Sequence, residues 1–196
     1  MTRILIATRN QGKAAEFADM LARLSLETVT LAEWAGLAEP EETGRTFMEN
    51  ACLKALYYAR MTGEICLADD SGLEVAALSG APGVFSARYA GQGAGDQANN
   101  RLLLERMAAK EQRACRFVCA LAVAGRDKII LTAEGIVDGE LLYAERGDGG
   151  FGYDPLFFCP ELGKTLAEAG MEEKNAVSHR GRALNALFKL WAEEQC

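Results

Sequence analysis

The sequence has one histidine and no C-x-x-C pair among its six cysteines, so the usual ligand pattern of a zinc site is missing. It also has no apolar run long enough to cross a bilayer. Its first residues form a strand-like segment, without the long apolar region of a signal peptide. We therefore expect a cytoplasmic protein with free, mainly packed thiols and no attachment to membranes.

Basic residues are fewer than acidic residues. The chain has 21 Lys and Arg against 28 Asp and Glu, which gives a formal net charge of −7. This balance argues against a sequence-independent grip on DNA or RNA, because nucleic-acid phosphates bind basic surfaces. A small anionic ligand needs only a local basic pocket, so it stays compatible with the acidic chain.

The remaining composition is that of an ordinary globular protein, with 49% hydrophobic and 25% charged residues over 196 positions. That length suits a single domain over residues 1–196 with a substantial core. Apolar runs at 116–124 and 128–135 flank a turn at 125–127, which predicts an antiparallel strand pair. Together with the helical segments, this pair predicts an α/β protein with a mixed sheet.

The other elements follow from apolar periodicity and capping residues. We expect strands at 3–8, 28–31 and 140–144, and a helix after Asn10 with Ala14, Phe17, Ala18, Leu21 and Leu24 on one face. A capping box at Thr46–Glu49 predicts a helix to about Met61. Further helices are expected at 96–109 and at the end of the chain, the last with Ala183, Leu184, Leu187, Phe188 and Trp191 on one face.

Two adjacent acids, Asp69 and Asp70, follow the apolar run 65–68 and precede Ser71 and Gly72. This pattern predicts a buried strand that ends at the acids, at the edge where open α/β sheets bind ligands. Neighbouring carboxylates repel each other, so a cation or a basic residue is expected to share the site. Magnesium needs only one or two protein carboxylates beside substrate phosphate oxygens, so the pair points to Mg²⁺ and phosphate chemistry.

An acidic loop at residues 36–45 holds two more candidate ligands, Glu41 and Glu42. We interpret Glu42 as a solvated loop charge. For Glu41, solvation and metal binding are about equally compatible with the sequence alone.

The junction between the first strand and the first helix can bind an anion, because the backbone N–H groups and the helix dipole favour negative charge there. Its residues are Thr8, Arg9, Asn10, Gln11, Gly12 and Lys13. The spacing is not that of a Walker A loop. The same segment, taken alone, is more typical of a capped helix with one exposed lysine.

Two further groups are suited to a nucleotide. Phe151, Gly152, Tyr153 and Asp154 form a glycine-containing loop in which the backbone can approach a planar base and an aromatic ring can stack on it. Lys174, His179 and Arg180 carry cations and hydrogen-bond donors for phosphates or a purine carbonyl oxygen. Arg88 and Tyr89 are at least as consistent with structural support.

Taken together, these blocks resemble the inosine/xanthosine triphosphate pyrophosphatase family. The similarity is carried by five segments in family order: 8–13, 41–51, 68–89, 149–155 and 178–181. The resemblance implies an elongated two-lobed α/β fold, a long mixed sheet flanked by helices, an active site in the cleft between the lobes, and a homodimer. It implies hydrolysis of ITP, dITP and XTP to the monophosphate and pyrophosphate.

Residue by residue, the resemblance implies that Asp70 is the proton acceptor and that Glu41 and Asp70 bind Mg²⁺. A carboxylate bound to Mg²⁺ is a poor base, so these two roles of Asp70 compete, and Asp69 can relieve the conflict by sharing the metal. Thr8–Lys13 and Lys174 are then expected to hold the triphosphate. Ser71, Phe151–Asp154, His179 and Arg180 are expected to bind the rest of the nucleotide. Arg9 departs from the family pattern, which commonly has a small residue there.

Two alternatives remain open at this point. One is a related septum-inhibitor (Maf-like) pyrophosphatase of modified pyrimidine nucleotides, against which the Ser178-His179-Arg180 and Phe151–Asp154 motifs argue. The other is a nucleotide-binding protein without activity, against which the intact Lys13, Asp69 and Asp70 argue.

Overall fold

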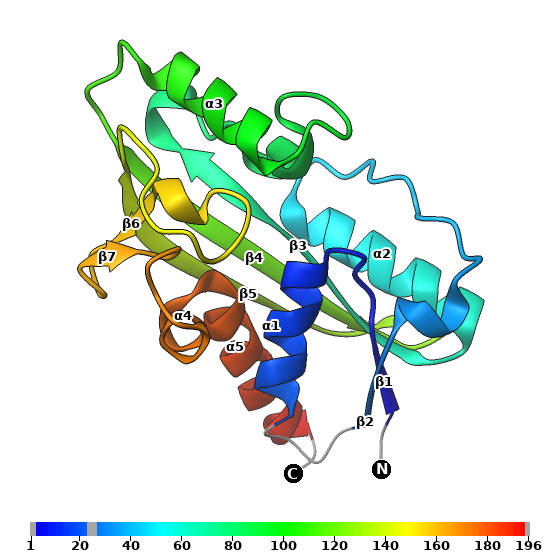
Figure 1. Ribbon diagram of the computed structural model, residues 1–196. Coiled ribbons are helices and arrows are strands. Elements are labelled where there is room, and N and C mark those ends of the chain that lie inside the picture. The colour runs from blue at the N-terminus through cyan, green and yellow to red at the C-terminus, as the bar shows by residue number, and fades with distance from the viewer. Residues whose placement is uncertain (1–2, 23–26, 195–196) are drawn as a thin grey trace. The chain divides into compact units, whose positions relative to one another are not determined.

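The computed structural model describes residues 3–22 and 27–194 (Figure 1). Its described residues form one sheet in the order β2-β1-β3-β4-β5-β6-β7. The strands are β1 (Arg3–Ile6), β2 (Glu27–Thr30), β3 (Ile65–Val75), β4 (Ala114–Ala124), β5 (Ile129–Leu141), β6 (Phe157–Cys159) and β7 (Lys164–Thr165). Strand β1 is parallel to β2 and β3, whereas β5, β6 and β7 pair antiparallel. The predicted mixed sheet is confirmed.

The helices are α1 (Gln11–Leu21), α2 (Phe47–Thr62), α3 (Asp96–Met107), α4 (Met171–Val177) and α5 (His179–Glu194). Asn10 caps α1 by accepting from the Lys13 N–H, and Thr46 caps α2 by accepting from the Glu49 N–H. Both predicted helix starts are confirmed, although Glu49 closes its box on the Arg45 N–H instead of that of Thr46. No helix within 3–22 and 27–194 is long and apolar enough to cross a bilayer.

The chain divides into two compact units. Unit 1 comprises Met1–Asp70, Cys119–Gly135 and Arg180–Cys196, and unit 2 comprises Ser71–Val118 and Ile136–His179. Strands β3, β4 and β5 therefore each contribute residues to both units. The single domain over 1–196 stays a prediction.

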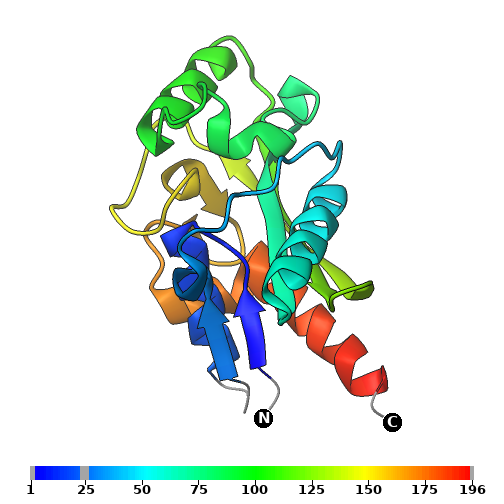
Figure 2. The ribbon, with the colours of Figure 1, turned by 90° about the vertical axis from the view of Figure 1, so that its right-hand side faces the viewer.

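The core of unit 1 lies between its strands and two helices, α1 and α5. Apolar side chains at alternating strand positions meet the inner faces of these helices, among them Ile4, Ile6, Phe17, Leu67, Leu121, Ala183, Leu184 and Leu187. Phe188 and Trp191 pack against this cluster, so the predicted apolar face of the last helix is confirmed; Leu24 lies outside the described residues. Leu5 and Cys66 alternate with these strand residues and are fully buried on the opposite face. Figure 2 shows α2 on that side of the strands.

The core of unit 2 is built from the parts of β3, β4 and β5 that belong to this unit, together with α3 and the residues next to β6. Its buried members include Leu73, Val75, Leu103, Met107, Phe117, Leu141, Leu156 and Phe157. Gly139 of β5 lets β6 approach closely, because a Cβ there would lie 2.4 Å from Cζ of Phe157. A glycine inside β5 thus serves packing, and it does not interrupt the strand.

This continuity corrects one sequence prediction. A separate strand at 140–144 is wrong, because β5 runs without a break from Ile129 to Leu141 and the chain leaves the sheet there. Tight packing on β6 requires Gly139, and neither Gly139 nor Gly135 ends the strand.

A second prediction, that a strand ends at the two acids, is also wrong. Strand β3 continues through Asp69 and Asp70 to Val75. The strand that ends is β1: Ile6 is opposite Leu67, and the Ala7 N–H donates to the Leu67 carbonyl at 2.8 Å. The acids therefore lie just beyond the carboxyl end of β1, beside the start of α1, which is the edge at which parallel strands bind ligands.

The thiols behave as the sequence indicates. Cys66, Cys115, Cys119 and Cys159 are buried and Cys52 is half-buried, and all five are free thiols. Cys196 lies outside the described residues.

Candidate active site

Asp69 is held by Lys13. The Lys13 Nζ lies 2.7 Å from Oδ2 of Asp69, whose side chain is 1% exposed. Burial by itself raises the pKa of Asp69, but Lys13, Lys54 and Arg180 outweigh burial and lower this pKa from its ordinary value to about 2. Asp69 is therefore ionised at neutral pH and fixes an ammonium group at the start of α1.

Asp70 contacts a different helix. Asn50 Nδ2 donates to its Oδ2 at 3.0 Å, and Lys54 Nζ donates to its Oδ1 at 3.4 Å. Asn50 and Lys54 are four residues apart on α2, so one face of the helix reaches both carboxylate oxygens. Burial raises the pKa of Asp70 above its ordinary value, Glu42 adds to that rise, and the hydrogen bond from Asn50 and the charges of Lys54 and Lys13 oppose it. The two neighbouring acids are thus shifted in opposite directions.

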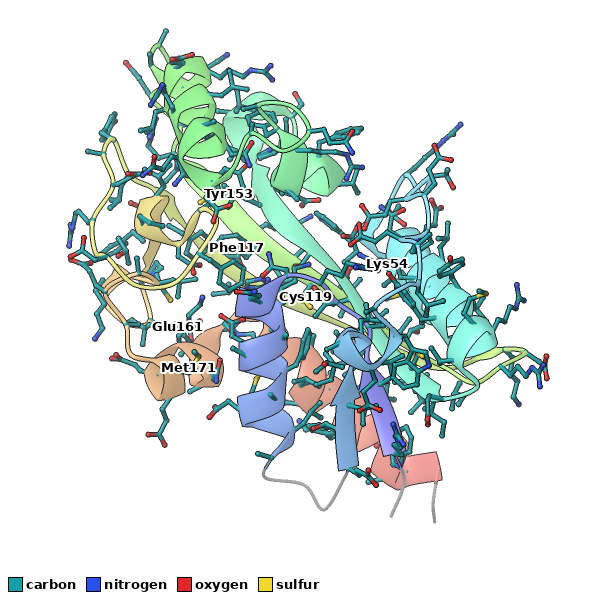
Figure 3. The ribbon with its side chains drawn as sticks, turned by 45° about the vertical axis from the view of Figure 1, so that its right-hand side comes forward. Lys54, Phe117, Cys119, Tyr153, Glu161 and Met171 are labelled. Atoms are coloured by element: carbon teal, nitrogen blue, oxygen red, sulfur yellow. The ribbon has the colours of Figure 1, made fainter. Side chains whose placement is uncertain are left out.

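Lys54 also binds the acidic loop. Its Nζ lies 2.7 Å from Oε1 of Glu42, whose side chain is 24% exposed. Figure 3 labels Lys54 on α2. The interpretation of Glu42 as a solvated charge is wrong, because Lys54 draws this carboxylate into the Asp70 site. Glu41 is exposed.

Asn50 ties the same loop to Asp70 through its other amide atom. Its Oδ1 accepts from the Gly44 N–H at 2.8 Å, while its Nδ2 donates to Asp70. Position 44 must be glycine because a Cβ would lie 2.5 Å from that Oδ1. A fully buried asparagine therefore sets the position of the acidic loop relative to the acid pair.

The predicted phosphate segment begins α1, as expected. Its Thr8 Oγ1 accepts from the Asn10 N–H at 3.3 Å, and Lys13 turns to Asp69. Arg9 contacts the acidic loop instead: its Nε lies 3.1 Å from Oε1 of Glu39 and its Nη2 donates to the Leu37 carbonyl. Gln11 is exposed and Gly12 is half-buried.

Arg180 forms a buried ion pair that sequence reasoning missed. Its Nη1 donates to Oε2 of Glu16 at 2.7 Å, and the two side chains are 4% and 2% exposed. Glu16 lies on the packed side of α1, next to Phe17. The only sequence signal was an acid beside an apolar position of an amphipathic helix.

In unit 2, the loop 151–154 is held by its own aspartate. Asp154 Oδ2 accepts from the Phe151 N–H at 2.8 Å and from Lys174 Nζ at 2.5 Å. The same Nζ lies 4.7 Å from the centre of the Phe151 ring, within cation–π distance. Position 150 must be glycine because its φ is +70° and a Cβ would lie 2.3 Å from Asp154 Oδ2.

Two more predicted residues are buried supports of the same unit. Tyr153, labelled in Figure 3, donates its hydroxyl to the Ser86 carbonyl at 2.8 Å. The His179 ring stacks on Phe117, with centroids 4.7 Å apart and an angle of 11° between the planes. Ser71 follows Asp70 on β3 and is half-buried.

The structure thus brings the predicted residues into two groups. One, in unit 1, joins Lys13, Asp69 and Asp70 with the charge of Arg180. The other, in unit 2, joins Phe151–Asp154 with Lys174. Sequence reasoning missed Asn50 and Lys54, whose signal was their four-residue spacing on a helix after an acidic loop.

Comparisons with known proteins cover almost the whole chain. A model of the Ham1 family matches residues 4–190. A dITP/XTP pyrophosphatase of Thermus thermophilus is 52% identical over 97% of this chain and 92% of its own length. One from Desulforamulus reducens is 48% identical over 96% and 94%, respectively.

Solved structures give the same result. The Staphylococcus aureus Ham1 protein superposes with a TM-score of 0.86 at 39% identity and covers 100% of both chains. A Ham1 protein from Coxiella burnetii has a TM-score of 0.88 at 41% identity, covering 98% of this chain and 100% of its own.

Proposed function

The chain belongs to the Ham1 family, and from that premise we propose that it hydrolyses ITP, dITP and XTP to the nucleoside monophosphate and pyrophosphate, which removes these nonstandard purines from the nucleotide pool. One observation carries the proposal: Asp70 is a buried carboxylate with a raised pKa, held between Asn50 and Lys54 beside the Lys13–Asp69 pair. A carboxylate and two ammonium groups in one place suit water activation next to a phosphate chain.

In this proposal Asp70 orients and deprotonates a water molecule that attacks the α-phosphorus in line with the leaving pyrophosphate. Its raised pKa makes it a stronger base than an exposed aspartate. Thr8–Lys13 and Lys174 bind the triphosphate, and Lys54 adds a second ammonium beside the reacting group. Asp69 positions Lys13, which answers why the chain carries two adjacent acids.

The residues at this place also fit Mg²⁺. Two carboxylates, Glu42 and Asp70, already hold the ammonium group of Lys54 between them, so this place favours positive charge. The available ligands are carboxylate oxygens, which Mg²⁺ prefers. We propose Glu41 and Asp70 as its ligands, because Glu41 is exposed and Lys54 lies farther from Asp70, at 3.4 Å, than from Glu42, at 2.7 Å. Asp69 is held at 2.7 Å by Lys13. When bound, Mg²⁺ neutralises charge on the triphosphate oxygens.

The base is proposed to lie on the loop Phe151–Asp154, with Ser71, His179 and Arg180 as further nucleotide contacts. A purine with an oxygen at position 6 accepts from such donors, whereas the amino group of adenine opposes them. We also propose a cytoplasmic homodimer, for which sedimentation equilibrium should give twice the chain mass.

The metal assignment predicts different results for two neighbouring glutamates. Glu41→Gln is expected to raise the Mg²⁺ concentration for half-maximal rate at least tenfold, because it removes an anionic ligand. Glu42→Gln is expected to shift that concentration less than threefold and to lower kcat, because Lys54 loses the nearer of its two carboxylate partners. A Mg²⁺ titration of the steady-state rate measures both. Equal shifts in the two variants would contradict the assignment.

The activity itself is tested by pyrophosphate release from ITP, XTP, ATP, GTP and modified pyrimidine triphosphates, each with Mg²⁺ and with a chelator. We expect release from ITP and XTP with Mg²⁺ at rates at least tenfold above ATP and GTP. Preference for a pyrimidine nucleotide would support the Maf-like alternative. Binding of ITP without release from any nucleotide would support an inactive nucleotide-binding protein.

A further inference from the structure

Helix α3 binds both polar groups of one peptide residue in the loop 151–154. The Gly152 N–H donates to Oδ2 of Asp96 at 2.7 Å, and the Gly152 carbonyl accepts from Nδ2 of Asn100 at 3.1 Å. Asp96 and Asn100 are four residues apart, so they lie on the same face of the helix. Gly152 is thereby fixed from outside the loop, by residues more than 50 positions earlier in the sequence.

The two acceptors around the Asn100 amide assign its orientation. Its Nδ2 donates to two acceptors, the Gly152 carbonyl and Oε1 of Glu145, which lies 2.7 Å away. A flipped amide would place an oxygen against these two oxygens. Asn100 is 3% exposed, so it binds Gly152 and Glu145 from a buried position.

The loop needs this external support because its conformation is unusual. Gly150 and Gly152 both have positive φ, +70° and +62°, a conformation in which glycine is favoured and from which a flexible loop readily departs. On the other side, Asp154 and Lys174 hold Phe151. Between these two attachments, Gly152 is the residue that decides the direction of the backbone from Phe151 to Tyr153.

We propose that Asp96 and Asn100 are positioning residues that set the conformation of the base-binding loop and thereby the affinity and selectivity for the purine base. The inference rests on the proposed function, since it takes loop 151–154 as the base site. Asp96 accepts from the Gly152 N–H and Asn100 donates to the Gly152 carbonyl, so the two form a clamp on this residue. Contacts with the base are therefore left to the neighbours of Gly152. Loosening the clamp moves those neighbours. Of the residues proposed for the triphosphate, Thr8–Lys13 lie outside this loop, and Lys174 keeps its own partner, Asp154.

The test uses Asp96, which is exposed and can be changed without opening the core. Asp96→Ala removes the acceptor of the Gly152 N–H, whereas Asp96→Asn keeps an oxygen that can accept from it. Gln97→Ala, at the next exposed position of the same helical turn, is the control. Titration calorimetry measures binding of two probes: IMP, which carries the base, and inorganic tripolyphosphate, which does not.

We expect Asp96→Ala to weaken IMP binding about fivefold, the usual effect of one lost hydrogen bond, and to leave tripolyphosphate binding within about twofold of the wild type. The same variant should lose selectivity for ITP over GTP in kcat/KM. Asp96→Asn should restore IMP binding to within about twofold, and Gln97→Ala should match the wild type.

Three results would overturn the inference: unchanged IMP binding by Asp96→Ala, equal weakening of IMP and tripolyphosphate, or no rescue by Asp96→Asn. Failure of the proposed function gives a different result, because wild-type protein would then release no pyrophosphate from ITP. The clamp and the activity are therefore tested separately.

Discussion

Replacing Asp70 with asparagine is expected to lower kcat for ITP by about 10²–10⁴-fold, the range found when a general base is removed. The amide has the size of the carboxylate and keeps one oxygen as acceptor, but it cannot take a proton from water. Nucleotide binding should change little, because Lys13 keeps its own partner, Asp69. Rapid-quench kinetics give the turnover, and calorimetry with a nonhydrolysable ITP analogue gives the binding.

The same substitution should not lower stability. Burial raises the pKa of Asp70, so the folded protein holds that proton more tightly than the unfolded chain does. Ionisation of Asp70 therefore costs stability as the pH rises through its titration range, and this cost is present at neutral pH. Lys54 retains Glu42 when Asp70 is neutral. We expect the Tm of Asp70→Asn at pH 7 to equal or exceed that of the wild type.

Asp127→Asn is the matched control, because Asp127 lies exposed in the turn between β4 and β5. It should leave both turnover and Tm unchanged. Turnover by Asp70→Asn within tenfold of the wild type would contradict the role of Asp70 as base. A large drop in its Tm would mean that the carboxylate supports the fold.

The second large effect is expected on stability. Glu16→Gln should lower the free energy of unfolding by about 3 kcal/mol, because it removes the carboxylate that pairs with the buried Arg180 guanidinium. For a chain of this size that loss lowers the Tm by roughly 6–12 °C. Urea unfolding followed by circular dichroism measures the free energy, and calorimetry measures the Tm.

Two further variants separate the buried pair from other effects. Asp19→Asn makes the same chemical change at an exposed position of α1 and should cost less than about 0.5 kcal/mol. The double variant Glu16→Met/Arg180→Met should recover at least half of the loss, because two apolar side chains bury no charge. A loss below about 1 kcal/mol in Glu16→Gln would show that water or another group compensates Arg180.

Local signals in the sequence correctly predicted the start of α1 and the irregular loop around residue 150. Asn10 and the apolar period after it define the beginning of α1, and the glycines around 150 define the irregular loop, because capping and positive φ are properties of adjacent residues. The family was found in the same way, from blocks of neighbouring residues. What sequence reasoning did not find are contacts between distant segments.

Asn50 and Lys54 illustrate the difference. Both bind Asp70, which is 20 and 16 residues away, and their helix could have turned another face to it. Likewise, the polarity of Asp69 and Asp70 suggested a strand end, but β3 continues because Lys13, Asn50 and Lys54 supply partners for charges that would otherwise be excluded from a buried strand. Such compensation becomes visible only when the helices are in place.

The division of the chain into interleaved segments also limits how this protein can change by recombination. Unit 1 consists of three stretches of sequence and unit 2 of two, so exchange of a whole unit between homologous genes needs crossovers at four places. Three of these places lie inside β3, β4 and β5, so a crossover at any of the three would join strand halves from different parents. Two of the four places, between Asp70 and Ser71 and between His179 and Arg180, fall between proposed substrate contacts. We therefore expect the site to change by point substitutions and its residues to be inherited together.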